Sequence, residues 1–199
     1  MAIRMHDIFG PGSNVKERVL QDYEDLGTKV RACKQLGLRI VLTSGSFDLF
    51  HEGHSRYLEA ARQRGDLLIV GVDEDEKVRQ KKGRNRPIVT EEHRCEILCH
   101  TRHVDLVFLK RLGDPQWQLI KTVRPDVLIA TQETYNEQQL VELRQFCGEV
   151  IVLPPQSANS TTSRIRLLLM GTAEEVRARL AAAVDDVNKF LDGLHGGRV

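Results

Sequence analysis

The stretch "LTSGSFDLFHEGHSRYL", residues 42–58, begins as an apolar strand and ends as an amphipathic helix. Gly45, Gly53, His51 and His54 lie in or beside the loop that joins the two. Ligands of open parallel sheets bind beyond the carboxyl ends of the strands, and a helix N-terminus binds phosphate through its N–H groups. The stretch therefore predicts a phosphate site to which both histidines donate hydrogen bonds. Taken alone, the histidine pair is equally compatible with ordinary polar loop residues.

The rest of the chain alternates strands with helices, and each strand is a nearly continuous apolar run. This pattern is typical of a parallel sheet covered by helices on both faces. We expect a Rossmann-like, doubly wound α/β domain with a five-stranded parallel sheet, and we expect the charged segment 73–87 to be a loop. The expected parts are an N-terminal arm and helix (1–37), the domain (38–170) and a C-terminal helical extension (171–199). The expected strands are 38–44, 66–72, 104–110, 126–130 and 149–154.

Composition and charge exclude several classes of protein. The chain has 29 Lys and Arg against 28 Asp and Glu, which predicts neither a nucleic-acid coat nor a membrane-surface protein. No apolar run has the length of a bilayer span, and the first residues lack the apolar core of a secretory signal. The 4 cysteines in a chain of 199 residues do not resemble a disulfide framework. We therefore expect a cytoplasmic protein.

The C-terminal segment carries apolar residues at heptad-like spacing. The spacing continues for little over two heptads. Two interpretations stay open, namely packing on the chain's own domain and contact in a homodimer. The residues of this pattern are Leu180, Val184, Val187, Leu191 and Leu194.

Together, residues 38–168 resemble the cytidylyltransferase-like nucleotidyltransferases with an HxGH motif. Besides "HEGH", the resemblance includes "YLEAARQRGDLLIVGVDED" (57–75), "KKGRNRPIVTEEHR" (81–94) and "NSTTSRI" (159–165), in the family's order and spacing. It is strongest to the branch of the adenylyltransferase that makes ADP-heptose, followed by glycerol-3-phosphate cytidylyltransferase and FAD synthetase. The resemblance implies that the phosphate of an acceptor attacks the α-phosphate of a nucleoside triphosphate, releasing pyrophosphate. The expected partners are the triphosphate with its Mg²⁺ and a small phosphorylated acceptor.

The resemblance also implies roles for individual residues. His51, His54 and Lys82 would be catalytic. The nucleotide would be bound by Ser44, Gly45, Ser46, Phe47, Gly53, Arg79, Arg94, Ser160, Thr161 and Thr162. The acceptor would be bound by Asp48, Thr131, Gln132 and Tyr135.

Structural alternatives accompany several of these roles. Ser160 is also a suitable helix N-cap, Asp48 is suited to capping its own turn, and the other basic residues of 77–86 suit a solvated surface. The helix 91–102 carries Cys95 and Cys99 at a spacing that allows a metal site, but small buried hydrophobes are the better interpretation, and we expect no protein metal site.

The segment "TQETYNE" (131–137) departs from the family pattern, because it contains no glycine where relatives have a glycine-rich loop. Base and acceptor preference are therefore open, and so is the alternative of a nucleotide-binding regulator without turnover.

Overall fold

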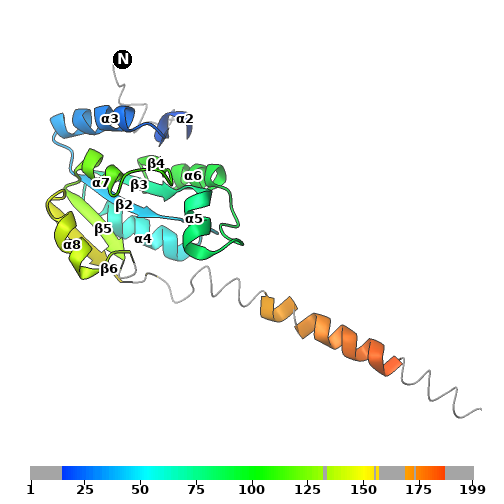
Figure 1. Cartoon of the computed structure of the whole chain (residues 1–199). Helices are drawn as coiled ribbons and strands as arrows, with labels where there is room; N and C mark the ends of the chain where they lie inside the picture. Colours follow the sequence, from blue (N-terminus) through cyan, green and yellow to red (C-terminus); the bar gives the residue numbers. More distant parts are fainter. Residues whose placement is uncertain (1–14, 132–133, 155, 157–168, 173, 187–199) are drawn as a thin grey trace, which may run out of the picture. The chain divides into compact units, whose positions relative to one another are not determined.

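The structure is a computed structural model that describes residues 15–131, 134–154, 156, 169–172 and 174–186 (Figure 1). The chain divides into two compact units, Met1–Ala158 and Asn159–Val199. The described part of the first unit contains a parallel sheet of six strands in the order β1-β4-β3-β2-β5-β6. The strands are β1 (Val19–Leu20), β2 (Ile40–Gly45), β3 (Leu67–Asp73), β4 (Leu106–Lys110), β5 (Val127–Thr131) and β6 (Glu149–Leu153).

The strand order places the HxGH loop at the switch point of the sheet. From β2, the chain moves outward through β3 to β4 and then returns to place β5 on the other side of β2. The register aligns Val41 of β2 with Leu68 of β3 and with Val127 of β5. The loop at the carboxyl end of β2 therefore lies where ligands of open α/β sheets bind. The expected parallel α/β fold is confirmed.

Helices cover both faces of the sheet. One face packs against α3 (Tyr23–Gln35), α7 (Gln118–Val123) and α8 (Glu137–Leu143), which bury Leu26, Ile120 and Leu143. The other face packs against α4 (Glu52–Arg62) and α6 (Glu91–His100), which bury Leu58 and Cys95. Each large apolar side chain removed from water stabilises the fold by about 1.5–3 kcal/mol. The helices on the two faces therefore hold the strands, and with them the strand ends, in place.

The number of strands is one more than predicted, because the segment expected to form one N-terminal helix contains a break. It forms α2 (Val15–Arg18), then β1, and then α3. Val19 and Leu20 pair with β4, and the Asp22 carboxylate accepts hydrogen bonds from the first N–H groups of α3. The break is invisible to periodicity, because Val15, Val19 and Tyr23 continue the helical spacing.

The segment 73–87 is a second correction, since it was expected to be a loop and contains helix α5 (Asp75–Lys82). Val78 is the one buried residue of this helix, so no apolar periodicity reveals it. Its Lys, Arg and Gln residues are nevertheless good helix formers. Gly83, with a φ of 95°, follows the last residue, a backbone conformation that glycine adopts readily.

In the second unit, residues 169–172 and 174–186 are helical. Leu180 and Val184 of the heptad-like pattern belong to this helix, whereas Val187, Leu191 and Leu194 lie outside the described residues. Packing on the domain and homodimer contact both stay predictions. Within the part of the chain that the structure covers, no helix combines the length and the apolar character needed to cross a membrane.

Candidate active site

The loop after β2 has a constrained backbone. Phe47 and Leu49 have positive φ angles of 49° and 48°, a conformation that costs a non-glycine residue of the order of 1–3 kcal/mol. The Phe47 side chain is only 6% exposed. Its ring lies 3.0 Å from the position that a Cβ at Gly45 would take, so Gly45 makes room for this anchor. Packing therefore holds the loop in one shape just before the histidines.

His51 is the N-cap residue of α4. Its Nδ1 accepts a hydrogen bond of 3.1 Å from the backbone N–H of Gly53. A neutral imidazole that accepts at Nδ1 carries its proton on Nε2. This hydrogen bond thus sets the tautomer and the orientation of His51. The structural role of Gly53, which is buried, is to supply the N–H group that donates it.

His54 lies against His51 and two aromatic rings. The two imidazole rings are stacked with centroids 4.0 Å apart, and the rings of Phe47 and Phe50 each lie 5.5 Å from His54. Burial, with smaller contributions from His51 and Lys82, lowers the pKa of His54 to about 4. Its Nδ1 is buried and has no hydrogen-bond partner among the described residues. His54 is therefore a neutral imidazole near pH 7.

The orientation of α4 is set by Tyr57, one helical turn after His54. The Tyr57 hydroxyl lies 2.7 Å from Oγ1 of Thr43 on β2. Thr43 in turn donates a hydrogen bond of 3.2 Å to the carbonyl of Ile129 on β5. The two strands at the switch point and the histidine-bearing helix are thereby joined by one hydrogen-bonded chain.

Lys82, the last residue of α5, reaches the same loop. Its Nζ donates a hydrogen bond of 2.8 Å to Oγ of Ser46. Burial, followed by the positive charge of Arg86, lowers the pKa of Lys82, and Asp48 and Asp73 act in the opposite direction. The structure thus brings the predicted residues Ser46 and Lys82 together, and the charge of Lys82 contributes to the lowered pKa of His54.

Asp48 joins this loop to the segment 86–89. Its buried carboxylate, in a residue only 2% exposed, accepts hydrogen bonds from the N–H groups of Ile88 and Val89. One carboxylate oxygen lies 2.8 Å from Nε of Arg86. These contacts give Asp48 a positioning role, because they fix the segment 86–89 against the loop; the expected acceptor contact stays a prediction.

Arg94, predicted to face the nucleotide, is 1% exposed and bonded to protein groups. Its guanidinium donates to the carbonyl oxygens of Val89, Ser46 and Asp73 and to the carboxylate of Asp75, at 2.5–3.0 Å. The guanidinium therefore joins the loop after β2, the end of β3 and the segment before α6. Arg94 positions the site through these contacts.

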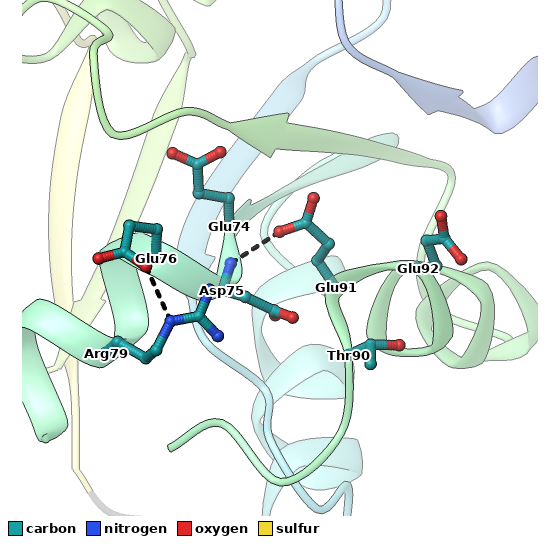
Figure 2. A pocket seen from close by; sticks show the side chains of 7 residues that line it. All are labelled: Glu74, Asp75, Glu76, Arg79, Thr90, Glu91 and Glu92. Carbon is teal, nitrogen blue, oxygen red and sulfur yellow. Dashed lines mark hydrogen bonds and ion pairs between the residues drawn. The ribbon is translucent and has the colours of Figure 1, made fainter. Parts of the chain in front are cut away.

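Arg79 lines an acidic pocket (Figure 2). Its Nε donates to Glu76 at 2.8 Å, and this exposed pair lies among carboxylates that repel a triphosphate. The hydrogen bond and ion pair of Arg79 are thus made with Glu76 in this pocket, and its expected contact with the nucleotide stays a prediction. The pocket is lined by Glu74, Asp75, Glu76, Arg79, Thr90, Glu91 and Glu92.

The other predicted positions are distributed as follows. Ser44 and Gly45 end β2, and Thr131 ends β5. Tyr135 packs beside the core on the α3 face of the sheet. Gln132 and the triplet Ser160, Thr161 and Thr162 lie outside the described residues, and their roles stay predictions.

Cys95 and Cys99 are buried on α6. Burial raises the pKa of Cys95 to about 12 and that of Cys99 to about 11, so both are protonated thiols that pack in the core. Among the described residues, no group of three His, Cys, Asp or Glu side chains is arranged to hold a metal ion.

Sequence reasoning missed three charged residues at the same edge of the sheet. Asp73 ends β3, Lys110 ends β4, and Lys81 of α5 reaches them. Asp73 and Lys110 are charged residues at the ends of apolar strands. Ligands of open α/β sheets bind beyond the carboxyl ends of the strands, so charged residues at these ends were a signal in the sequence for further site residues.

Residues 42–168 match the cytidylyltransferase-like family. The chain belongs to this family. The match spans the loop after β2, the histidine pair and Lys82, and it extends through the later "NSTTSRI" segment. The predicted family is therefore confirmed, and with it the prediction of a nucleotidyltransferase.

Curated relatives of this cytidylyltransferase-like chain include bifunctional proteins HldE. HldE of Methylobacillus flagellatus is 39% identical over 148 residues, covering 73% of this chain and 30% of the relative. HldE of Geotalea uraniireducens is 36% identical over 169 residues, covering 83% of this chain and 33% of the relative. The chain thus spans about a third of the length of these relatives.

Solved structures agree on the fold. A lipopolysaccharide core biosynthesis protein from Thermoplasma volcanium is 26% identical, with a TM-score of 0.53, and covers 59% of this chain and 97% of its own. A pantoate-beta-alanine ligase from Francisella tularensis has the same TM-score at 14% identity, covering 72% and 68%. This second likeness concerns the fold alone.

Proposed function

We propose that this chain transfers a nucleoside monophosphate from a nucleoside triphosphate to a sugar- or polyol-phosphate and releases pyrophosphate. The observation that carries the proposal is the stacked pair of His51 and His54 at the start of α4. The pair lies at the switch point of the sheet, beside a loop to which Lys82 is hydrogen-bonded. Two imidazoles, an ammonium group and a helix N-terminus together suit a polyphosphate.

The reaction needs no activated side chain as nucleophile. An oxygen of the acceptor phosphate, already an anion, attacks the α-phosphorus, and a new P–O bond forms. The bond between the α-phosphorus and the bridging oxygen breaks, and pyrophosphate leaves with the electron pair. His51, His54 and Lys82 stabilise the negative charge that shifts onto the α-phosphate and pyrophosphate oxygens. Alignment of the two phosphates supplies the rest of the acceleration.

The neutral state of His54 suits this task. A neutral imidazole donates a hydrogen bond without titrating near pH 7, and the buried site makes that bond stronger than in water. The triphosphate brings its own Mg²⁺, which neutralises part of its charge. The protein side chains then have to orient the complex and exclude water from it.

We further propose ATP and heptose 1-phosphate as substrates. The identity to HldE proteins, in which the related domain is the adenylyltransferase of ADP-heptose synthase, supports this choice. Glycerol 3-phosphate with CTP, and FMN with ATP, are the next candidates, because the segment 131–137 lacks the family's glycine-rich loop. A regulator that binds nucleotide without turnover is the remaining alternative.

The test is pyrophosphate release with Mg²⁺, in which ATP, CTP, GTP and UTP are each combined with heptose 1-phosphate, other sugar 1-phosphates, glycerol 3-phosphate and FMN. We expect release that requires one triphosphate and one acceptor together, with ATP and heptose 1-phosphate giving the highest kcat/KM. Nucleotide binding without release across the panel would favour the regulator. No nucleotide binding at all would contradict the phosphate site itself.

A further inference from the structure

A cluster of three lysines and one aspartate lies at the carboxyl edge of the sheet, beside the proposed site. Asp73 and Lys110 are register partners at the ends of β3 and β4. Lys110 Nζ lies 3.1 Å and Lys81 Nζ 2.9 Å from the Asp73 carboxylate. Lys77 Nζ lies 3.9 Å from it. We call these four residues the lysine cluster.

The lysine cluster carries more positive charge than its carboxylate balances. Three ammonium groups and one carboxylate leave a net charge of +2. Asp73 is 6% exposed, and burial alone would raise its pKa, but Lys110 and Lys81 outweigh burial and lower it. Placing like charges together in a half-buried position is unfavourable unless an anion offsets them. One lysine would have been enough to neutralise Asp73.

The ammonium groups keep hydrogen-bonding capacity for a ligand. An ammonium group has three N–H donors. Among the described residues, Lys110 uses one of them, on Asp73, and so does Lys81. The Lys81 side chain is 56% exposed and that of Lys110 is 20% exposed. The carboxylate thus holds the two ammonium groups in place, and their other N–H donors have no protein partner among the described residues.

Gly71 connects the lysine cluster to the proposed site. A Cβ at Gly71 would lie 2.9 Å from Cδ of Lys110, 2.7 Å from Oγ of Ser44 and 2.5 Å from Leu119. The stem of Lys110 and the side chain of Ser44 therefore both border the space that Gly71 leaves on β3. The charge of Asp73 acts on both Lys82 and Tyr135. The lysine cluster thus lies beside Gly71 and Ser44, and its aspartate is within electrostatic range of Lys82 and Tyr135.

We propose that Lys81 and Lys110 bind a second anionic group on the acceptor, distant from the phosphate that reacts. This inference rests on the proposed nucleotidyl transfer and adds a preference among its acceptors: of two phosphate monoesters with the same sugar, the one that also carries a second phosphate or a carboxylate binds more tightly, and singly anionic acceptors such as heptose 1-phosphate use the reacting-phosphate site alone. The reacting phosphate is held at His51, His54 and Lys82. The second anion occupies the lysine cluster, and Asp73 positions the two ammonium groups without contacting the acceptor.

The test uses three acceptors that differ at one carbon: glucose 1-phosphate, glucose 1,6-bisphosphate and glucuronic acid 1-phosphate. With the triphosphate that supports turnover, we expect the two doubly anionic acceptors to have a kcat/KM at least about 10-fold above that of glucose 1-phosphate. A preference for the bisphosphate alone would identify phosphate as the second anion, and an equal preference would identify anions of either kind. Equal kcat/KM for all three contradicts the inference.

Variants then locate the effect. Lys110→Met keeps the stem beside Gly71 and removes the charge. Lys81→Met, at a more exposed position, is the second variant and serves if Lys110→Met does not fold. Either should reduce the preference for the doubly anionic acceptor by about 10- to 100-fold, through KM, whereas Lys81→Arg should restore part of it. Lys34→Met, on α3 away from the cluster, is the matched control and should keep the preference. An unchanged preference in both cluster variants overturns the inference.

Calorimetry separates this inference from the proposed function. Glucose 1,6-bisphosphate should bind the wild type about 10-fold or more tightly than glucose 1-phosphate, and Lys81→Met should abolish the difference. If no acceptor supports pyrophosphate release, the proposed function is wrong. The difference in binding between the two glucose phosphates then still shows whether the lysine cluster binds a second anion. If release occurs and the binding difference is absent, the anion site fails alone.

Discussion

His51 and His54 stack with ring centroids 4.0 Å apart and planes inclined by 27°, while Nδ1 of His51 accepts the N–H of Gly53. The hydrogen bond fixes one ring, and the stacking fixes the second ring relative to the first. Burial opposes the protonation of His54, and the adjacent imidazole of His51 opposes it further. His54 is therefore held as a neutral hydrogen-bonding group beside the oriented ring of His51.

The first prediction concerns the pH dependence of stability. The pKa of His54 is about 4 in the folded protein, below the value of about 6.5 for an unfolded chain. The unfolded state therefore binds more protons between these values, and the free energy of unfolding should fall by about 2–3 kcal/mol as the pH is lowered through this window. His54→Asn should remove this part of the pH dependence in urea unfolding at about pH 7 and about pH 4.5. His100→Asn, whose side chain is 70% exposed, should retain it, and an equal slope in both variants would contradict the assignment.

The second prediction concerns catalysis by the pair. His54→Ala should lower kcat by about 100-fold or more, the usual loss for one transition-state donor. The circular dichroism spectrum should stay native, because the Nδ1 of His54 has no partner in the described part of the chain. Turnover within about threefold of the wild type would remove His54 from the reaction.

The third prediction separates Lys82 from its support. Lys82→Met should lower kcat by about 100-fold, because a charge close to the phosphates is lost. Ser46→Ala should cost less, about 3- to 10-fold, because it removes one hydrogen bond of 2.8 Å and leaves the charge. A larger loss in Ser46→Ala than in Lys82→Met would show that Ser46 acts on the substrate directly.

The fourth prediction contrasts two arginines that were both expected to contact the nucleotide. Arg94→Met should lower the free energy of unfolding by about 3–5 kcal/mol, because it leaves the partly buried Asp75 and three carbonyl groups without their partner. Arg79→Met removes only an exposed pair with Glu76 and should change stability by less than about 1 kcal/mol. Denaturant unfolding of both variants is the measurement, and equal effects would contradict the buried network.

Much of the fold follows from the sequence, because the apolar runs of β2 to β6 and the periodicity of α4 are local properties. The break at β1 is not local, since it depends on the pairing of Val19 and Leu20 with β4. Helix α5 was not predicted, because it buries a single residue, Val78. A hydrophobic pattern in the sequence indicates which side chains are buried, so it gives little signal for a helix that buries a single residue.

The candidate site is predictable to a similar degree. The positions of His51, His54 and Lys82 followed from spacing and from the family resemblance. The structural contacts of Asp48 and Arg94 did not, because they depend on partners 19 to 48 positions away in the chain, such as Asp75 and Ser46. The lysine cluster was missed because it forms only when β3 and β4 pair in their register.

The central claim is that the α-phosphate of the nucleotide is the group transferred. The most direct measurement follows a phosphorus label in the triphosphate, placed at the α position in one reaction and at the γ position in another, with heptose 1-phosphate or the best acceptor of the panel. We predict that the α label appears in the acceptor product and the γ label in pyrophosphate, and that His54→Ala slows both by about 100-fold. Appearance of the γ label in the acceptor product would show phosphoryl transfer instead and would contradict the account.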